Sequence, residues 1–344
     1  MKNILLTLKK IIPKEIEILQ RRYKILRGIN YYQPIGRRSL SQKLSISEKI
    51  IRNETEYLKS EGYILVSSSG MQITKEGISI LEDLKDVMHH VIGLHYLEKE
   101  VKKYLGCSNV VVVPSDASEH NIKENIGKSA SEVLLKQIKD NTIIALTGGS
   151  TVYNVVNALK QPNTLSDNVL VVPARGSLRN NVKYQANNIV SILSKKLSGQ
   201  YRLLNIPDNL SKKSLESVRE EPDIQETISS ILKANVILFG IGNAHEMAGR
   251  RNSSKSVMEY LSCKQAVAEA LGYYFNKNGE IVYTSSSIGI KLERMTKTAY
   301  PIAVAGGENK AEAIIAVKNI IQEGSLIIDE GAANKIISIM KHNN

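Results

Sequence analysis

From residue 107 onward, short runs of β-branched residues alternate with segments of helical periodicity. This alternation is typical of an α/β domain with a largely parallel sheet, because parallel strands need a long crossover between them. The larger part of the chain is therefore predicted to be α/β. The predicted strands cover residues 110–113, 142–146, 169–172, 236–239, 302–305 and 326–328.

Glycine-containing loops follow four of these strands, at residues 147–151, 174–176, 240–242 and 306–307. In an open α/β sheet, ligands bind outside the carboxyl ends of the strands, where such loops collect. In the first loop, Gly148 and Gly149 let the backbone approach an anion, Ser150 and Thr151 offer hydroxyls, and the following helix presents its amides. The loop is neither a Walker loop nor a dinucleotide fingerprint. It predicts a phosphate site, with a plain glycine turn as the alternative.

Charge divides the chain into two parts. Its 344 residues favour two domains over one. Residues 1–75 contain 15 basic and 6 acidic residues, a net charge of +9, whereas the whole chain carries +12. A strongly basic N-terminal part joined to a nearly neutral body indicates a polyanion-binding head. We expect domains at residues 1–75 and 107–344, joined by a linker or dimerisation helix at 76–106.

Helix and turn signals follow one another in order within the basic head. The predicted elements are a helix from Pro13, a short segment at 39–44 followed by a break at 45–46, a helix from Ser47 to about Gly62, and short strands at 63–66 and 71–74. Ser47 suits an N-cap and Gly62 a C-terminal cap. This order predicts a winged helix-turn-helix.

The helix from Ser47 to about Gly62 is the second helix of the predicted helix-turn-helix, and it is expected to lie in the major groove of DNA. Arg52 and Asn53 can each form paired hydrogen bonds to base edges, so they are the candidates for sequence readout. The alternative is a basic, solvated surface on a small helical domain. The predicted DNA-binding residues are Arg37, Arg38, Lys43, Ser47, Glu48, Lys49, Arg52 and Asn53.

Residues 74–106 are predicted to be helical, with two apolar series that are offset by one residue and end at Gly106. This stripe could pair two subunits, which we favour, or pack on the α/β body of its own chain. His89, His90 and His95 lie here without ligand spacing, so no metal site is expected.

Several classes of protein are excluded. No run approaches the length of apolar residues that a membrane helix needs, and no signal peptide is recognisable, so a cytoplasmic protein is expected. Cys107 and Cys263 have no cysteine or histidine neighbours at ligand spacing. A disulfide framework and a zinc site are therefore not indicated, and no cofactor is expected.

Together, the head and the loops resemble, over nearly the full chain, the sorbitol-operon-type (SorC-like) bacterial transcription regulators. The matching stretches are residues 147–151, 172–176, 240–242 with Arg250-Arg251, and 305–307 with Lys310. The resemblance implies a winged-helix domain fused to a Rossmann-like sugar-phosphate-binding domain of the phosphosugar isomerase and deaminase type. It also implies a repressor of a glycolytic (glyceraldehyde-3-phosphate dehydrogenase) operon, which binds double-stranded operator DNA as a dimer or tetramer.

Fructose 1,6-bisphosphate is the effector that the resemblance implies. Such a ligand carries about three to four negative charges, because the second pKa of each phosphate is near 6. One phosphate suits the loop and the other needs cations, for which arginine forks are well shaped. By resemblance alone, Gln185 and Glu269 contact sugar hydroxyls. The predicted effector-binding residues are Gly149, Ser150, Thr151, Val152, Arg175, Gln185, Arg250, Arg251, Glu269 and Lys310.

An enzyme is the less favoured alternative, behind a regulator that responds to another sugar phosphate. Deaminases of this fold are similar around residues 240–242, with the pattern Gly-x-Gly-x-Asp-Gly-His. Here the acid is absent and His245 falls one position early. Proton transfer needs a base within hydrogen-bond reach, so this departure argues against catalysis.

Overall fold

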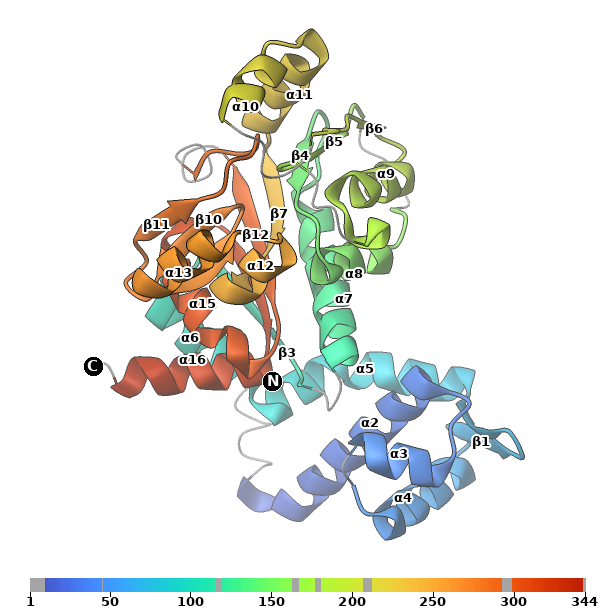
Figure 1. Cartoon of the computed structure of the whole chain (residues 1–344). Helices are drawn as coiled ribbons and strands as arrows, with labels where there is room; N and C mark the ends of the chain where they lie inside the picture. The colour runs from blue at the N-terminus through green and yellow to red at the C-terminus, as the bar shows by residue number, and fades with distance from the viewer. Residues whose placement is uncertain are drawn as a thin grey trace. The chain divides into compact units, whose positions relative to one another are not determined.

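The structure is a computed structural model that describes residues 10–44, 46–115, 119–162, 167–176, 181–206, 212–292 and 299–342 (Figure 1). The chain forms two compact units, which divide between Tyr96 and Leu97. Ser45, part of the predicted break at 45–46, lies outside the described residues.

The smaller unit has its helices and hairpin in the predicted order. Ile29, Leu40 and Ile51, from three different helices, are completely buried in one core. Each lies on the apolar stripe of its own helix, so the three helices close around that core. The elements are α2 (Pro13–Tyr32), α3 (Arg37–Leu44), α4 (Glu48–Ser60), the antiparallel pair β1 (Ile64–Ser67) and β2 (Gly70–Ile73), and α5 (Lys75–Ile92).

Helix α4 begins and ends with the predicted caps. The Ser47 hydroxyl accepts a hydrogen bond from the amide of Ile50 over 3.4 Å. At the other end, the amide of Gly62 donates to the Lys59 carbonyl, and the amide of Tyr63 donates to the Leu58 carbonyl. This paired arrangement is a Schellman motif, and it needs the left-handed backbone of Gly62, whose φ is +76°.

Residues 74–106 form two helices, so the expectation of one continuous helical stretch is wrong. Helix α5 ends at Ile92, and α6 (Leu94–Leu105) begins after Gly93, whose φ is +87°. The break falls where the two apolar series change register. Gly106, with a φ of +71°, ends α6 as predicted.

Part of the apolar stripe of residues 74–106 packs within the smaller unit. Met88 and Val91 of α5 are buried against Ile16 of α2. The side-chain amide (Nε2) of Gln20 on α2 also donates to the Val91 carbonyl over 3.2 Å. Packing of this stripe against α2 was not predicted, and dimerisation through residues 76–106 stays a prediction.

The larger unit is built on a parallel sheet that includes all six predicted strands. Its strand order is β3-β13-β12-β7-β4-β5-β6. The sequence patterns missed β6 because it is a two-residue edge strand with exposed side chains. The bounds are β3 (Asn109–Val113), β4 (Ile143–Leu146), β5 (Leu170–Pro173), β6 (Gln200–Tyr201), β7 (Val236–Gly240), β12 (Tyr300–Ala305) and β13 (Ser325–Asp329).

Helices cover this sheet as expected for an α/β domain. Ile144 and Leu146 of β4 are completely buried in the same core cluster as apolar residues of α7, α8 and α9. None of the helices in the described ranges is long and apolar enough to cross a membrane. The helices are α7 (Glu119–Gln137), α8 (Ser150–Ala158), α9 (Ala186–Leu197), α10 (Lys212–Arg219), α11 (Pro222–Leu232), α12 (Ala244–Arg250), α13 (Lys255–Cys263), α15 (Ala311–Ala316) and α16 (Glu330–His342), with short 3-10 helices η1 (Val182–Tyr184), η2 (Glu308–Lys310) and η3 (Lys318–Ile320).

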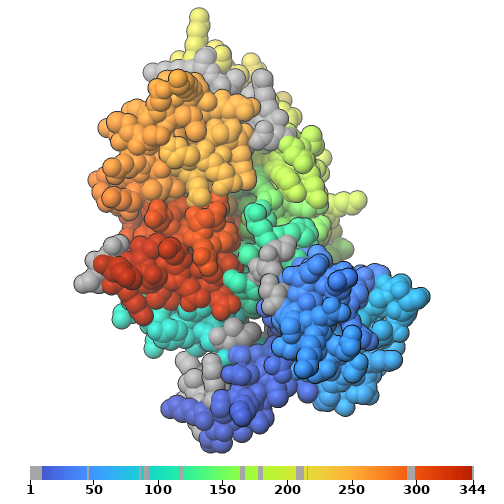
Figure 2. All heavy atoms as spheres, turned by 60° about the horizontal axis from the view of Figure 1, so that its bottom comes forward, coloured from blue at the N-terminus to red at the C-terminus, as the bar shows by residue number. Residues whose placement is uncertain are grey.

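A second sheet in the larger unit was not predicted. It is antiparallel, with the order β11-β10-β9-β8. In Figure 2, its segment of the chain and α13 form one orange block of surface on this unit. Alanines at alternate positions of β9 disguise that strand, since alanine has low β propensity. The strands are β8 (Gly242–Asn243), β9 (Ala266–Ala270), β10 (Tyr273–Asn276) and β11 (Ile281–Thr284).

Candidate functional site

The order of strands reverses between β4 and β7. From β4 the chain continues outward to β5 and β6, whereas β7, β12 and β13 follow one another in the opposite direction. The loops after β4 and β7 therefore diverge and leave a crevice, which is where ligands bind in open α/β sheets.

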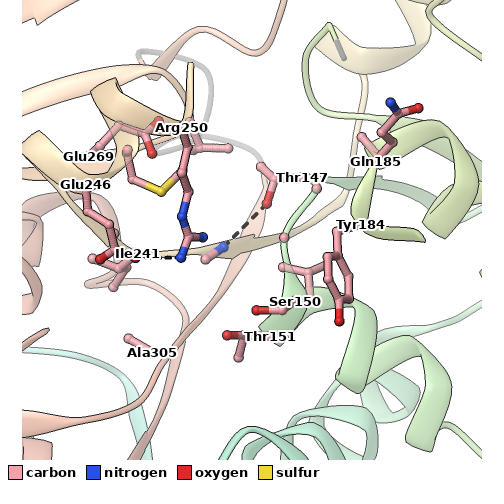
Figure 3. Close-up of a pocket in the computed structure, with 18 of the residues that line it drawn as sticks. Thr147, Ser150, Thr151, Tyr184, Gln185, Ile241, Glu246, Arg250, Glu269 and Ala305 are labelled. Carbon is pink, nitrogen blue, oxygen red and sulfur yellow. Dashed lines mark hydrogen bonds and ion pairs between the residues drawn. The ribbon is translucent and has the colours of Figure 1, made fainter. Parts of the chain in front are cut away.

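A pocket of about 390 Å³ lies at this point, within the size range of small-molecule sites. All ten predicted effector-binding residues line it. Ser150 and Thr151 face the space into which Arg250 extends from the other side (Figure 3). The remaining lining residues are Glu119, Lys123, Thr147, Gly148, Gly176, Asn181, Tyr184, Ala186, Gly240, Ile241, Gly242, Glu246, Met247, Leu271, Ala305 and Gly306.

The glycine loop holds the start of α8 in place. The amide of Gly149 donates to the Tyr184 carbonyl over 2.9 Å. It therefore does not point to a ligand, contrary to the prediction that it binds a phosphate. A Cβ on Gly148 would lie 2.6 Å from the same carbonyl, which explains the glycine. The amides of Ser150, Thr151 and Val152 form the first turn of α8, where no intrahelical acceptor exists. These three amides can hold an anion.

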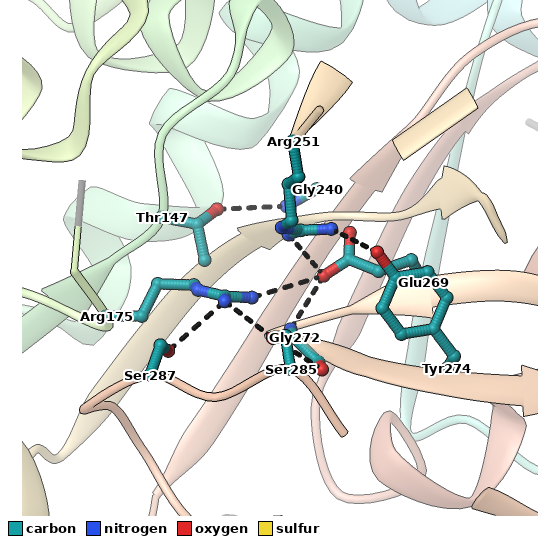
Figure 4. Close-up of polar contacts among 9 residues, drawn as sticks. All are labelled: Thr147, Arg175, Gly240, Arg251, Glu269, Gly272, Tyr274, Ser285 and Ser287. Atoms are coloured by element: carbon teal, nitrogen blue, oxygen red, sulfur yellow. Dashed lines mark hydrogen bonds and ion pairs between the residues drawn. The ribbon is translucent and has the colours of Figure 1, made fainter. Parts of the chain in front are cut away.

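Two predicted cations, Arg175 and Arg251, are buried in the pocket wall. They are only 5% and 8% exposed, and both donate to Glu269 Oε1, at 3.4 Å and 2.8 Å respectively. The amide of Gly272 donates to the same oxygen over 2.6 Å. Figure 4 shows the Glu269 carboxylate between the two guanidinium groups. Two cations and one anion leave this wall with one net positive charge.

Hydroxyl groups complete the buried cluster. Arg175 donates to Ser285 and Ser287, at 2.8 Å and 3.2 Å, and Arg251 donates to the Tyr274 hydroxyl over 2.8 Å. Burial raises the pKa of Tyr274 although the charge of Arg251 opposes the change, so the phenol stays protonated. These bonds occupy the terminal nitrogens of both guanidinium groups and hold both side chains in fixed orientations.

The other two predicted cations, Arg250 and Lys310, share a different carboxylate of the pocket lining. Each donates to a different oxygen of Glu246, at 2.5 Å and 2.6 Å respectively. Burial alone would raise the pKa of Glu246, but the hydrogen bond from Lys310 and the surrounding cations outweigh it and hold the pKa below its ordinary range. Glu246 is therefore ionised at neutral pH.

Three charged lining residues were missed from sequence. Glu246 lies four residues before Arg250, and Glu119 lies four residues before Lys123, a spacing that places both pairs on one helix face. That spacing signals a pair but not its location in a pocket. With them included, the lining contains five cationic side chains and three carboxylates, a net charge of +2.

Predicted DNA contacts lie on α3 and α4 of the smaller unit. Arg52, Asn53 and Lys49 are exposed on α4 together with Glu48, and Ser47 is its exposed cap. On α3, Arg38 and Lys43 are exposed, with the Lys43 ammonium 4.2 Å from the centre of the Tyr32 ring, and Arg37 is half-buried. The eight residues therefore gather on two consecutive helices.

A buried carboxylate on α4 was not predicted. Glu54, 7% exposed, accepts from Arg21 over 2.8 Å and from Arg22 over 2.7 Å, both on α2. Burial would raise the pKa of Glu54, but the hydrogen bonds from Arg22 and Arg21 and their charges lower it overall. Glu54 thus holds α4 on α2 while its neighbours Arg52 and Asn53 face solvent.

The histidine considered for catalysis, the groups considered for metal binding and the two cysteines do not form a second site in the described residues. His245 is exposed on α12 and does not line the pocket. In the part of the chain that the structure describes, no three His, Cys, Asp or Glu side chains form a group that could hold a metal. Cys107 and Cys263 are both free thiols, the first buried and the second exposed.

Two family models match successive parts of the chain. The model for the CggR N-terminal DNA binding domain matches residues 18–88, and a model for a sugar-binding domain matches residues 89–338. The boundary between them lies close to the division between the two compact units.

Relatives of known role match nearly the whole chain. The central glycolytic genes regulator of Bacillus subtilis (strain 168) is 38% identical over 338 residues, which cover 98% of this chain and 99% of that protein. The central glycolytic genes regulator of Priestia megaterium is also 38% identical, over 340 residues and the same shares of both chains.

Solved structures agree in fold. A SorC family transcriptional regulator from Enterococcus faecalis, 36% identical, superposes with a TM-score of 0.66 over 71% of this chain and 100% of that one. The full-length sorbitol operon regulator SorC from Klebsiella pneumoniae, 19% identical, has a TM-score of 0.65 over 92% of this chain and 98% of its own.

Proposed function

Because the chain belongs to the SorC family of sugar-responsive, DNA-binding transcription regulators, we propose that it represses a glycolytic operon carrying glyceraldehyde-3-phosphate dehydrogenase. Its effector is fructose 1,6-bisphosphate, which weakens cooperative binding to the operator. Relatives over nearly the full chain are transcription regulators, so the protein is a regulator and not an enzyme.

The observation that carries this proposal is the pairing of two anion-binding groups across one pocket. The amides of Ser150, Thr151 and Val152 begin α8, directly after β4. Arg250 extends into the pocket from the side opposite Ser150 and Thr151 (Figure 3), and Lys310 shares the Glu246 carboxylate with Arg250. A sugar with a phosphate at each end matches this arrangement. Val152 contributes only its amide, because its side chain is buried in the core.

The middle of the pocket suits the sugar. Gln185 precedes α9, and Glu269 comes from β9, so the two polar groups enter from different segments. Glu269 Oε1 already accepts three hydrogen bonds. A sugar hydroxyl would therefore bind Glu269 through Oε2.

DNA binding is assigned to a winged helix-turn-helix in which α4 enters the major groove and the β1–β2 hairpin is the wing. Arg52 and Asn53 would read bases, and Arg37, Arg38 and Lys43 would contact phosphates. The repressor would bind as a dimer or tetramer, since operator half-sites need paired heads. The larger domain's likeness to phosphosugar isomerases and deaminases remains part of this proposal.

Effector binding can act on DNA only by favouring one arrangement of the protein over another. A bisphosphate would draw the α8 and α12 sides of the pocket together and change the contacts between subunits. A coupling of about 1 to 3 kcal/mol would change operator affinity about 5- to 150-fold.

The experiment is an operator titration followed by fluorescence anisotropy, with and without millimolar fructose 1,6-bisphosphate. We expect a weaker, less cooperative isotherm with the bisphosphate and little change with fructose. An isotherm that is identical in affinity and stoichiometry under both conditions would refute the proposed effector.

A second candidate is a regulator that responds to another sugar phosphate. The observation that favours this candidate is the similarity to the deoxyribonucleoside regulator of Bacillus subtilis, which is 22% identical over 321 residues. A thermal-shift panel of sugar phosphates separates the two, because a ligand stabilises the native state according to its concentration relative to Kd.

A further inference from the structure

Glu246 lies on the cationic side of the pocket. Its two carboxylate oxygens accept separately from Arg250 and from Lys310, at 2.5 Å and 2.6 Å. Arg250 is on α12 with Glu246, whereas Lys310 is at the end of η2. One carboxylate therefore bridges two segments that are 64 residues apart in sequence.

We propose that Glu246 is an internal competitor that sets how strongly this pocket prefers a sugar bisphosphate over a monophosphate. The inference rests on the proposed function, in which the second phosphate binds Arg250 and Lys310. To reach them, that phosphate must displace the Glu246 carboxylate. A monophosphate avoids the competition, because its single phosphate can bind the amides of α8.

Charge and exposure support a displaceable carboxylate. The lining carries a net charge of +2 with Glu246 in place and would carry +3 without its carboxylate. A bisphosphate brings about three to four negative charges. Its second phosphate meets two cations, Arg250 and Lys310, that are already paired, and it is repelled by the Glu246 carboxylate that pairs with them. The Glu246 side chain is 38% exposed, unlike Glu269 at 4%, so it can turn toward water when a phosphate arrives.

The surroundings of Glu246 make its effect specific to one end of the pocket. Lys123 adds to the positive potential at Glu246, and Glu119 is close enough to interact with it unfavourably. The Ser150 and Thr151 hydroxyls lie on the other side of the pocket (Figure 3). Removing the charge of Glu246 should therefore act mainly on the phosphate that binds Arg250 and Lys310.

The test is isothermal titration calorimetry on the full chain, with fructose 1,6-bisphosphate and fructose 6-phosphate, in the parent and Glu246→Gln. We expect the variant to bind the bisphosphate about tenfold more tightly, the size of two partly exposed ion pairs. Its Kd for the monophosphate should stay within about twofold of the parent value. The control is Glu259→Gln, which removes an exposed carboxylate paired at 3.9 Å with Lys255 on the adjacent α13, and should change neither Kd.

Other outcomes overturn the inference in distinguishable ways. Equal tightening for both sugars would mean that Glu246 acts only through the overall charge. Weaker bisphosphate binding by Glu246→Gln would mean that the carboxylate orients Arg250 and Lys310 for the ligand. If neither protein binds the bisphosphate, the inference fails together with the proposed effector. Bisphosphate binding with an unchanged preference removes the inference alone.

Discussion

Arg251 donates a hydrogen bond to Glu269 over 2.8 Å, and both side chains are almost completely buried at the pocket wall. Arg175 shares the same carboxylate oxygen. A single carboxylate thus balances two arginines that come from opposite sides of the switch point, Arg175 after β5 and Arg251 after α12.

Replacing that carboxylate should destabilise the larger unit. Glu269→Gln leaves two buried guanidinium groups without their counter-ion, for which we expect a loss of about 3 to 5 kcal/mol in the free energy of unfolding. Urea unfolding followed by circular dichroism measures it. Glu280→Gln is the matched control, because Glu280 is an exposed residue beside the same antiparallel sheet whose carboxylate accepts from Asn276 over 2.7 Å. Equal stability of the two variants would contradict the role of Glu269.

The smaller unit should depend on pH through Glu54. Its pKa in the folded protein lies below its unfolded value, so the stabilisation is present above about pH 4.3 and is lost as the pH falls through the folded pKa. At pH 7, Glu54→Gln should cost about 1.5 to 3 kcal/mol, the usual range for hydrogen bonds to a charged group. Below pH 4 the difference from the parent should shrink.

Thermal unfolding at pH 7 and at pH 3.5 tests this dependence. Glu56→Gln, two residues along α4, removes an exposed carboxylate that is 4.0 Å from Arg37 and should be nearly neutral. A Glu54→Gln variant whose deficit is the same at both pH values would show that the lost contacts are not electrostatic.

The two functions should be separable by mutation. Arg250→Ala should lose the response to bisphosphate and keep operator binding, because Arg250 lines the pocket of the larger unit. Arg52→Ala should weaken operator binding about 5- to 150-fold, the range for one lost base contact, and keep the Kd for bisphosphate. Anisotropy and calorimetry on the same preparations measure both.

The control for Arg52 is Lys59→Ala, an exposed cation in the last turn of the same helix. It should weaken operator binding far less, because the N-terminal residues of a recognition helix contact the bases. Loss of both activities in either Arg52→Ala or Arg250→Ala would contradict the division of labour between the units.

The glycine loop should not tolerate a side chain. In Gly148→Ala, the new Cβ would lie 2.6 Å from the Tyr184 carbonyl, so the start of α8 must shift. We expect bisphosphate binding to weaken by at least about tenfold, since small misplacements of a positioned group are costly. Gly249→Ala is the control, because a Cβ there meets no atom within 4 Å. Calorimetry showing equal Kd values for the two variants would contradict the assignment of this loop.

The two cysteines should differ in reactivity. Burial raises the pKa of Cys107 to about 12, so almost no thiolate is present at pH 8, whereas Cys263 is exposed. Brief treatment with iodoacetamide at pH 8 should modify Cys263 alone, and both residues should react in denaturant. Mass spectrometry of peptides identifies the sites, and modification of Cys107 in the folded protein would be the contrary result.

Local patterns were sufficient for much of the fold. The strands of the parallel sheet are apolar β-branched runs, and the caps of α4 at Ser47 and Gly62 need only neighbouring residues. The loop at 147–151 is likewise recognisable from its glycines and hydroxyls. Gly93 shows the limit, because the apolar periodicity on both sides of it concealed a break that its backbone makes.

A basic helical head, a parallel α/β body and the strand ends at which ligand loops collect are readable from the residues alone, because they depend on short-range periodicity and on the direction of the strands. The partner of each charge is not readable in this way, because it depends on the packing of the folded chain. Arg175 and Arg251 are committed to Glu269, Arg250 and Lys310 to Glu246, and Arg21 and Arg22 to Glu54. Most of these partners are far apart in the chain, so whether a cation faces a ligand or a buried carboxylate follows from how distant segments pack together.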